Sequence, residues 1–455
     1  MYGRIRHIHF VGIGGIGMSG IAEVLLNMGY GVTGSDLKRT DIVDRLEQLG
    51  ARIFINHSAE NIGNADVVVT SSAIKKNNPE VLAAQSQKIP VIPRAEMLAE
   101  LMRLKYGIAV AGSHGKTTTT SMISTVLGFG GFDPTIVVGG KVKTLGSNAH
   151  LGKGSFMVVE ADESDGSFLM LSPVIAVVTN IDREHLDYYE NMIHLEEAFS
   201  NFLNKIPFYG LAVLCVDSPR LNSIISAFKK RFITYGFSPQ AEFRAEEVKV
   251  NGFETHFKVL FNNSLLGNVK LNIPGRHNAQ NSLASFAVGM ELRMSFERIR
   301  DGLAEFRGIE RRLQIKGESN GVLVIDDYGH HPEEILATFK TLRESFSKRL
   351  IVIFQPHRYT RTQILFNDFV SVLGEPDMLH ILDIYSAGET TIPGVTSEKL
   401  TQAIKDKGHK NVYYAKEQDE VIQRVLQVLR PGDLVLTLGA GNVWKLGEKI
   451  VEELS

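Results

Sequence analysis

The chain has 455 residues, of which 44% are hydrophobic and 22% are charged, and its formal net charge at pH 7 is −2. These values are ordinary for an α/β protein of about three domains, and the lack of a basic excess argues against a nucleic-acid partner. One cysteine, Cys215, excludes a disulfide framework, and no apolar run approaches the length that spans a bilayer. We therefore expect a cytoplasmic protein without membrane insertion, either a monomer or a homodimer.

The first part of the chain, residues 1–105, alternates strand-like and helix-like stretches, which predicts a parallel sheet with helical crossovers. Between a strand at 7–11 and a helix at 15–28, the turn has the spacing G-x-G-x-x-G, with Gly12, Gly14, Gly15 and Gly17. Asp36 ends the next strand, 19 residues after Gly17. This pattern is typical of a turn that binds a pyrophosphate at a helix N-terminus. It fits a nicotinamide dinucleotide or a UDP-sugar, and a merely tight turn is the alternative.

The second part, residues 106–312, begins with GIAVAGSHGKTTTT at 107–120. An apolar strand, a glycine turn and a helix start in this order predict a loop whose N–H groups bind ATP phosphates. The loop is shorter than usual, because Val110 stands five residues before Gly115 where a glycine is expected. We predict that ATP is bound by Gly112, Ser113, His114, Gly115, Lys116, Thr117 and Thr118, with Lys116 on the outer phosphates and Thr117 on a magnesium ion.

Polar residues follow further strands of this part. Glu160, Asp162, Glu163 and Asp165 come after an apolar run, where they predict either magnesium ligands or a solvated acidic loop. His185 leaves another strand, as a ligand or as a structural hydrogen-bonding residue. Asn278 and Asn281 share one face of a helix and could bind adenine, although capping explains Asn278 equally well. Between 232 and 274, alternating short strands predict a small antiparallel flap.

The third part, residues 313–455, again alternates strands and helices. DDYGHHP at 326–332 and QPHRYTRT at 355–362 both follow strands, so each lies at the carboxyl edge of its sheet, where α/β proteins bind ligands. Arg358 and Arg361 could hold a carboxylate through paired hydrogen bonds, and a surface charge cluster is the alternative.

The motifs GIGGIGMSG, GSHGKTTTT, EADESD, HNAQN, DDYGHHP and QPHRYTRT, in this order, closely resemble those of the Mur ligases of peptidoglycan synthesis. The resemblance runs over nearly the whole chain. It implies a Rossmann-like UDP-sugar-binding domain at 1–105, a central P-loop ATPase-type α/β domain with the flap at 106–312, and a Rossmann-like amino-acid-binding domain at 313–455. A nicotinamide-dependent dehydrogenase would leave Lys116, Thr117 and the third domain without a purpose.

The resemblance also implies a reaction. ATP, with Mg²⁺, would activate the muramoyl carboxylate of UDP-N-acetylmuramate as an acyl phosphate, and L-alanine would then form the amide. A sister ligase that joins a preformed peptide to the same sugar nucleotide is the alternative.

The implied site residues fall into groups. Met18, Ser19, Asp36 and the four glycines of the first turn would bind the UDP-sugar. Thr117, Glu160 and His185 would bind Mg²⁺, while His277, Asn281 and Arg312 or Arg311 would contact the nucleotide. Tyr328, His330, His357, Arg358 and Arg361 would surround the amino acid, and these last four, with Lys116, would be catalytic. Either histidine could accept the amine proton, because histidine titrates near working pH.

One departure from the family concerns the metal. Sister ligases carry a carbamate-modified lysine shortly after the segment that holds His185. The matching stretch here, EEAFSNF at 196–202, has no lysine. One metal ligand is therefore left unassigned, and water or Glu163 is expected in its place.

Overall fold

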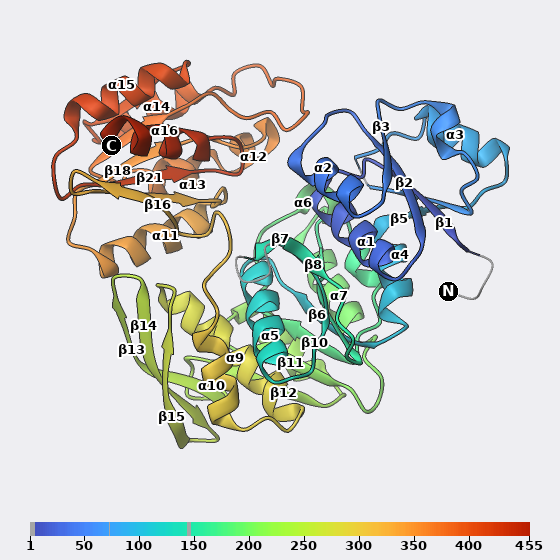
Figure 1. The fold of residues 1–455 in the computed structure, drawn as a ribbon. Helices are drawn as coiled ribbons and strands as arrows, with labels where there is room; N and C mark the ends of the chain where they lie inside the picture. The colour runs from blue at the N-terminus through green and yellow to red at the C-terminus, as the bar shows by residue number, and fades with distance from the viewer. Residues whose placement is uncertain (1–4, 72, 143–146) are drawn as a thin grey trace. The chain divides into compact units, whose positions relative to one another are not determined.

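The structure is a computed structural model that describes residues 5–71, 73–142 and 147–455. The chain folds as two compact units (Figure 1). The first comprises the chain up to Val248 together with 256–272 and 278–307, and the second comprises 249–255, 273–277 and 308–455. Within the described ranges, none of the helices combines the length and the apolar character needed to cross a lipid bilayer.

The N-terminal sheet has five parallel strands in the order β3-β2-β1-β4-β5. Its strands are β1 (His7–Val11), β2 (Gly31–Asp36), β3 (Arg52–Ile55), β4 (Val67–Thr70) and β5 (Val91–Pro93). Its helices are α1 (Ile16–Asn27), α2 (Asp41–Gln48), α3 (Pro79–Ser86) and α4 (Arg94–Met102), with a 3₁₀ turn at Ala59–Ile62. Thr40 and Asn78 cap α2 and α3 with their side chains. The predicted glycine turn follows β1 at the carboxyl edge of this sheet.

The central sheet has ten strands in the order β15-β14-β13-β12-β11-β10-β6-β9-β7-β8. They are β6 (Tyr106–Ala111), β7 (Thr135–Val142), β8 (Ser147–His150), β9 (Phe156–Glu160), β10 (Ile175–Val178), β11 (Leu211–Cys215), β12 (Phe232–Gly236), β13 (Phe243–Asn251), β14 (Glu254–Phe261) and β15 (Ser264–Leu271). β6 lies between β9 and β10 and is parallel to both, so its carboxyl end, where the GKT loop begins, is at the middle of the sheet.

The helices of the central part are α5 (Lys116–Phe129), α6 (Leu186–Tyr189), α7 (Met192–Leu203), α8 (Pro219–Ala227), α9 (Arg276–Glu291) and α10 (Phe296–Ala304), with a 3₁₀ turn at Ser167–Met170. Within the first unit, α1 packs against β7 and β8. Asn148 Nδ2 donates a 2.6 Å hydrogen bond to the carbonyl of Ile16, at the start of α1. The N-terminal glycine turn is therefore tied to the central sheet.

The sheet of the second unit has six strands in the order β16-β17-β21-β18-β19-β20, and only the edge strand β16 is antiparallel to its neighbour. Its strands are β16 (Gln314–Ser319), β17 (Val322–Asp327), β18 (Leu350–Phe354), β19 (Met378–Ile381), β20 (Val412–Tyr414) and β21 (Leu434–Leu438). Its helices are α11 (Pro332–Ser345), α12 (Tyr359–Ile364), α13 (Phe366–Val372), α14 (Ser397–Asp406), α15 (Gln418–Val428) and α16 (Trp444–Leu454).

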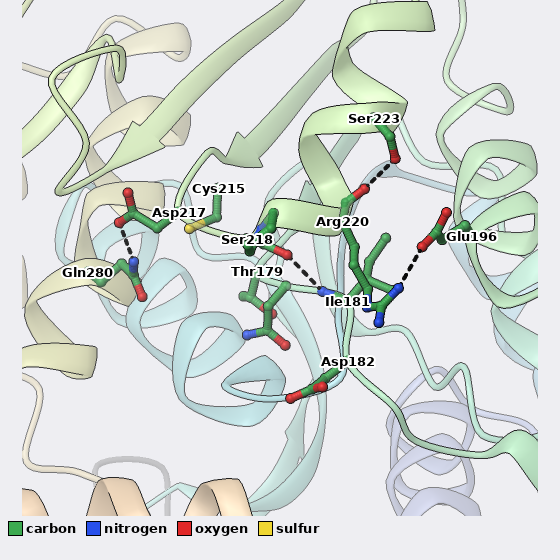
Figure 2. Close-up of a pocket in the computed structure, with 12 residues that line it drawn as sticks. Thr179, Ile181, Asp182, Glu196, Cys215, Asp217, Ser218, Arg220, Ser223 and Gln280 are labelled. Carbon is green, nitrogen blue, oxygen red and sulfur yellow. Dashed lines mark hydrogen bonds and ion pairs between the residues drawn. The ribbon is translucent and has the colours of Figure 1, made fainter. Parts of the chain in front are cut away.

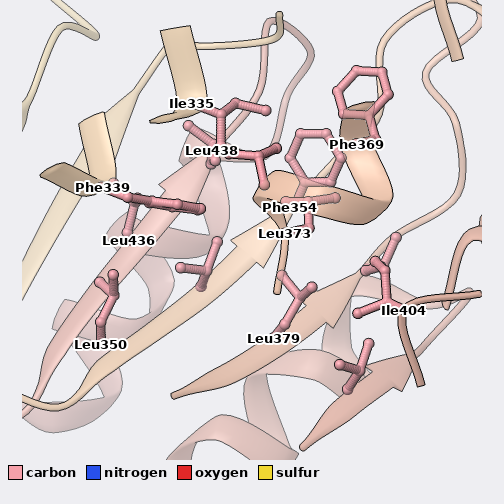
Figure 3. Packing of buried hydrophobic residues seen from close by; sticks show 14 of the residues in the cluster. Ile335, Phe339, Leu350, Phe354, Phe369, Leu373, Leu379, Ile404, Leu436 and Leu438 are labelled. Carbon is pink, nitrogen blue, oxygen red and sulfur yellow. The ribbon is translucent and has the colours of Figure 1, made fainter. Parts of the chain in front are cut away.

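Both faces of this sheet are apolar because helices cover both. On one face, Ile335 and Phe339 of α11 pack against Leu436 and Leu438 of β21 (Figure 3). A second cluster on the other face includes Leu446 and Ile450 of α16. The packed sheet holds the ends of β17, β18 and β21 together at one edge.

Candidate active site

The GKT loop requires glycine at two positions. Gly112 and Gly115 have φ angles of +136° and +78°, which L side chains rarely adopt. A Cβ at position 112 would lie 2.1 Å from Thr179 Oγ1 and 3.0 Å from the Asn180 carbonyl. A Cβ at position 115 would lie 3.0 Å from the side-chain amide of Asn281. The structure thus brings Asn281, the predicted adenine contact, against the loop.

The residues after β10 hold this loop in shape. Thr179 Oγ1 donates to the carbonyl of His114 at 2.6 Å, and the His114 N–H donates to Asn180 Oδ1 at 2.8 Å. The Asp182 N–H donates to Ser113 Oγ at 2.8 Å. These three hydrogen bonds tie the loop to the residues after β10.

The ammonium of Lys116 points back into the loop. Its Nζ donates to the carbonyls of Gly112 and Ser113 at 2.6 and 3.1 Å and lies 2.8 Å from Glu163 Oε1. Glu163 is 1% exposed, and burial raises its pKa to about 7 although the ammonium opposes this shift. Burial lowers the pKa of Lys116, but the carboxylates of Glu163 and Glu160 outweigh it and the net shift is upward. Lys116 thus stays charged beside a carboxylate that sequence reasoning did not pair with it.

A candidate Mg²⁺ site includes the Glu163 carboxylate of this pair. Glu163, Glu184 and His185 each offer a ligand atom, and these atoms lie within 4.8 Å of one another. Glu163 Oε2 is buried without a hydrogen-bond partner among the described residues. Carboxylate oxygens suit Mg²⁺, so the residues present fit the ion. Glu160 is not in this group, and its Oε2 accepts a hydrogen bond from the Gly139 N–H at 2.8 Å.

The N-terminal turn is anchored on β2. The N–H groups of Gly12 and Ile13 donate to the carbonyl of Ser35 at 2.8 and 3.0 Å. The Gly14 N–H donates to Asp36 Oδ2 at 2.9 Å, so Asp36 shapes the turn. The remaining predicted residues of this group occupy the start of α1: Gly15 is its N-cap, Met18 and Ser19 are buried, and a Cβ at Gly17 would lie 2.6 Å from Arg94.

Arg94 was not predicted as a site residue. Its Nη2 lies 2.5 Å from Asp162 Oδ2, which joins the glycine turn to the acidic segment after β9. A cavity of about 700 Å³ opens at the ends of β10 and β11, and Figure 2 shows the residues that line it. Asp182, Asp217 and Gln280 line it, and Gln280 Nε2 donates to Asp217 Oδ2 at 2.5 Å. Gln280 precedes Asn281 on α9, so this cavity adjoins the loop.

The DDYGHHP segment of the second unit begins with the last two residues of β17. The ring of Tyr328 lies close to two cations, with the guanidinium carbons of Arg311 and Arg312 at 4.9 and 5.5 Å from its centroid. Arg312 Nη1 also lies 3.2 Å from Glu334 Oε1. The pKa of His277, in the same unit, falls to about 4 through burial and then through the Arg312 charge.

The second segment, after β18, brings the remaining predicted residues together. The rings of His330 and His357 have centroids 5.8 Å apart, and Arg361 Nη1 lies 3.3 Å from His357 Nδ1. Burial, followed by His330 and the arginines, lowers the pKa of His357 to about 3. This differs from the expectation that His357 titrates near working pH, because the ring is partly withdrawn from water beside positive charge. His357 is a neutral ring at pH 7.

Backbone strain marks three of the predicted positions. His185, Arg311 and Arg358 have φ angles of +57°, +62° and +71°, in a region that favours glycine. Such conformations persist where surrounding contacts impose them, often at functional sites. No sequence pattern indicated these strained conformations. The sequence did not indicate Glu184, Tyr385 and Glu389 either, although they contact or adjoin predicted residues in the structure.

Comparison with known proteins identifies the family. Models of the Mur ligase family match three consecutive stretches: the catalytic domain over residues 7–106, the middle domain over 110–289, and the glutamate ligase domain over 311–441. The chain therefore belongs to the Mur ligase family.

Individual relatives are similar to this chain over nearly its full length. The UDP-N-acetylmuramate–L-alanine ligase of Geotalea uraniireducens is 56% identical over 100% of this chain and 99% of its own length. The enzyme of the same name from Geobacter sulfurreducens is 55% identical over equal shares. The crystal structure of UDP-N-acetylmuramate–alanine ligase from Thermotoga maritima matches with a TM-score of 0.84 at 29% identity, covering 99% of both chains. A murein peptide ligase structure from Psychrobacter arcticus shares the fold at 23% identity, with a TM-score of 0.71 over 99% of this chain and 98% of its own.

Proposed function

We propose that the protein uses ATP to join L-alanine to the muramoyl carboxylate of UDP-N-acetylmuramate, a step of peptidoglycan precursor synthesis in the cytoplasm. The single observation that carries the proposal is the GKT loop, with the charged Lys116 ammonium inside it and an acidic cluster beside it. The relatives at 55–56% identity over the full length support the choice of substrates.

Each of the three parts of the chain would bind a different substrate. Residues 1–105, with the turn that starts α1 and Asp36, would bind the diphosphate of the sugar nucleotide. Residues 106–312 would bind ATP, with its phosphates on the GKT loop and its nucleoside toward Asn281 and the adjoining cavity. Residues 313–455 would bind the amino acid.

In the first step, an oxygen of the muramoyl carboxylate attacks the γ-phosphorus of ATP and ADP leaves. The Lys116 ammonium leaves the Glu163 carboxylate and binds the phosphates of ATP. Its charge then offsets the negative charge on the transferring phosphoryl group. Mg²⁺, held by residues among Thr117, Glu160, Glu163, Glu184 and His185, would neutralise phosphate charge when bound. The product is an acyl phosphate, whose carbonyl carbon is open to an amine.

In the second step, the neutral amine of L-alanine attacks that carbonyl carbon, and the C–O bond to phosphate breaks. Arg358 and Arg361 would hold the alanine carboxylate, and Tyr328 would limit the side chain that fits. His357, neutral at pH 7, could accept a hydrogen bond from the amine, while a ring with a pKa of about 3 is too weak a base to hold its proton at that pH. His330 is therefore the better candidate for proton acceptor.

The sister-ligase reaction, with a preformed peptide in place of L-alanine, is tested in the same assay. The purified chain is given ATP, Mg²⁺ and UDP-N-acetylmuramate, and ADP release is measured with L-alanine, glycine, L-serine or the tripeptide. We expect rapid ADP release with L-alanine and the matching amide product. No ADP release with L-alanine would refute the proposal, and release with the tripeptide alone would favour the sister reaction.

A further inference from the structure

The segment that follows β19 lies against the predicted amino-acid residues. The Tyr385 N–H donates to the Pro356 carbonyl, and the Arg358 N–H donates to the Tyr385 carbonyl, both at 2.8 Å. Tyr385 and His357 thereby form a parallel bridge beyond the ends of the strands. The backbone at 356–358 is therefore hydrogen-bonded to Tyr385, which follows it by nearly 30 positions in the sequence.

The side chain of Tyr385 fixes the His357 ring. The two rings stack with centroids 5.6 Å apart and an angle of 8° between their planes. His330 contacts His357 at a steeper angle, 58°. The turn after β21 packs against Tyr385 as well, since a Cβ at Gly441 would lie 2.9 Å from Tyr385 Cγ. The plane of the His357 ring is thus set by its neighbours.

The carboxylate of Glu389 fixes Arg358. Oε1 accepts from Arg358 Nε at 2.6 Å and from Thr360 Oγ1 at 2.7 Å, and Oε2 accepts the Thr360 N–H at 3.1 Å. Burial raises the pKa of Glu389, but the bonds from Thr360 and the Arg358 charge outweigh it and hold the pKa below its usual value. Glu389 therefore stays ionised and accepts hydrogen bonds both from the side chain of Arg358 and from Thr360 at the start of α12.

These contacts explain how Arg358 keeps its strained backbone, with φ +71°. They also set the direction of the guanidinium. Because Nε is bonded to Glu389, the Nη nitrogens are presented on the other edge of the group, where a ligand carboxylate can accept two hydrogen bonds.

We propose that Glu389 and Tyr385 are positioning residues of the amino-acid site, with Glu389 orienting Arg358 toward the substrate carboxylate and Tyr385 orienting His357. The inference rests on the proposed function for the identity of that substrate. Neither residue reacts, so their loss changes affinity for the amino acid more than the handling of ATP.

The test compares Glu389→Ala, Glu389→Gln and Tyr385→Ala with a matched control, Glu420→Gln. Glu420 makes a similar ion pair in the same unit, with Arg424 Nη2 at 2.5 Å from Glu420 Oε1. We expect Glu389→Ala to raise the KM for L-alanine about tenfold, because a bond to a charged group is lost, and the KM for ATP to stay within about twofold. Glu389→Gln keeps two acceptor contacts and should lie between. Tyr385→Ala should also raise the KM for L-alanine more than the KM for ATP, because the His357 ring loses its stacking partner, and Glu420→Gln should match the wild type.

Hydrogen exchange of the 356–362 peptide supplies a readout that does not depend on the reaction. We expect faster exchange in Glu389→Ala and wild-type exchange in Glu420→Gln. Unchanged exchange, an unchanged KM for L-alanine, or equal rises in the KM values of L-alanine and ATP would overturn the inference. If the wild type releases no ADP with L-alanine, the proposed function fails, while the exchange data still decide whether Glu389 holds this segment.

Discussion

The GKT loop and the amino-acid end of the second unit are built on different principles, although in each of them a predicted cation is paired with an acid that the sequence did not indicate as its partner. Lys116 and Glu163 are 15% and 1% exposed, and the turn that holds Lys116 is fixed by two glycines and by hydrogen bonds to the residues after β10. Arg358 and Glu389 are 39% and 16% exposed and are held by side chains from a separate segment. We expect a substitution in the first arrangement to disrupt the whole loop, whereas a substitution in the second should weaken the hold on Arg358 by degrees.

This difference follows from what each site must bind. A phosphate chain is recognised by N–H groups that converge on it, so the backbone itself must have the right form before binding. An amino-acid carboxylate is recognised by a guanidinium, whose direction depends on its partners. Substitutions at the GKT loop should therefore have all-or-none effects, and substitutions around Arg358 should have graded ones.

The largest effect is expected for Lys116→Ala. Removing the cation that faces the transferring phosphoryl group should lower turnover about a thousandfold. The fold should survive, because Glu163 has its pKa raised to about 7 and can take up a proton once the ammonium is gone. ADP release and thermal unfolding measure the two parts of this prediction. The control is Lys449→Ala, which removes an equal charge from an exposed pair with Asp419. Turnover within tenfold of the wild type would remove Lys116 from the mechanism.

Much of the fold was predictable because its signals are local. The strand, glycine turn and helix start around Lys116 are contiguous, and so are those around Gly12 and Gly439. Each requires only short-range periodicity and turn chemistry. The parallel α/β class, shared with the Thermotoga maritima structure, follows from the alternation of such units.

The missed contacts are distant in sequence. Lys116 and Glu163 are 47 residues apart, Arg358 and Glu389 are 31 apart, and Arg94 and Asp162 are 68 apart. Periodicity predicts strands but not their order, and only the placement of β9 beside β6 brings Glu163 to the loop. The pKa of His357 could not be predicted either, since it depends on burial and on charges that the fold assembles.

A pair of glycine substitutions compares the two regions directly. Gly112→Ala places a Cβ against Thr179 and the Asn180 backbone at a φ of +136°, so we expect a loss of about 2–4 kcal/mol in stability and no ADP binding. Gly441→Ala has no left-handed φ to strain it, and it meets Gln355 Oε1, the end of a flexible side chain, as well as the Tyr385 ring, so a smaller loss of about 1 kcal/mol is expected. Denaturant unfolding and ADP titration measure both. Equal losses would show that the second region is as rigid as the first.

The smallest effect tests whether Glu163 competes with phosphates for Lys116. Glu163 Oε1 lies 2.8 Å from the ammonium, so a phosphate that takes Lys116 as its partner competes with this carboxylate. Without divalent cations, Glu163→Gln should bind ADP about fivefold more tightly, because a neutral amide holds Lys116 less strongly than a carboxylate. Calorimetric titration in EDTA measures the change.

The matched control for this last test is Glu184→Gln, which removes a charge from the same acidic cluster but not the partner that bonds Lys116 Nζ. It should tighten ADP binding less than Glu163→Gln does. Adding Mg²⁺ should reduce or reverse the gain in Glu163→Gln, because Glu163 is also among the residues that fit the ion. If Glu163→Gln bound ADP no more tightly than the wild type in EDTA, the carboxylate would only anchor the loop. The two regions would then differ less than their burial suggests, since in both the acid would serve to position the cation.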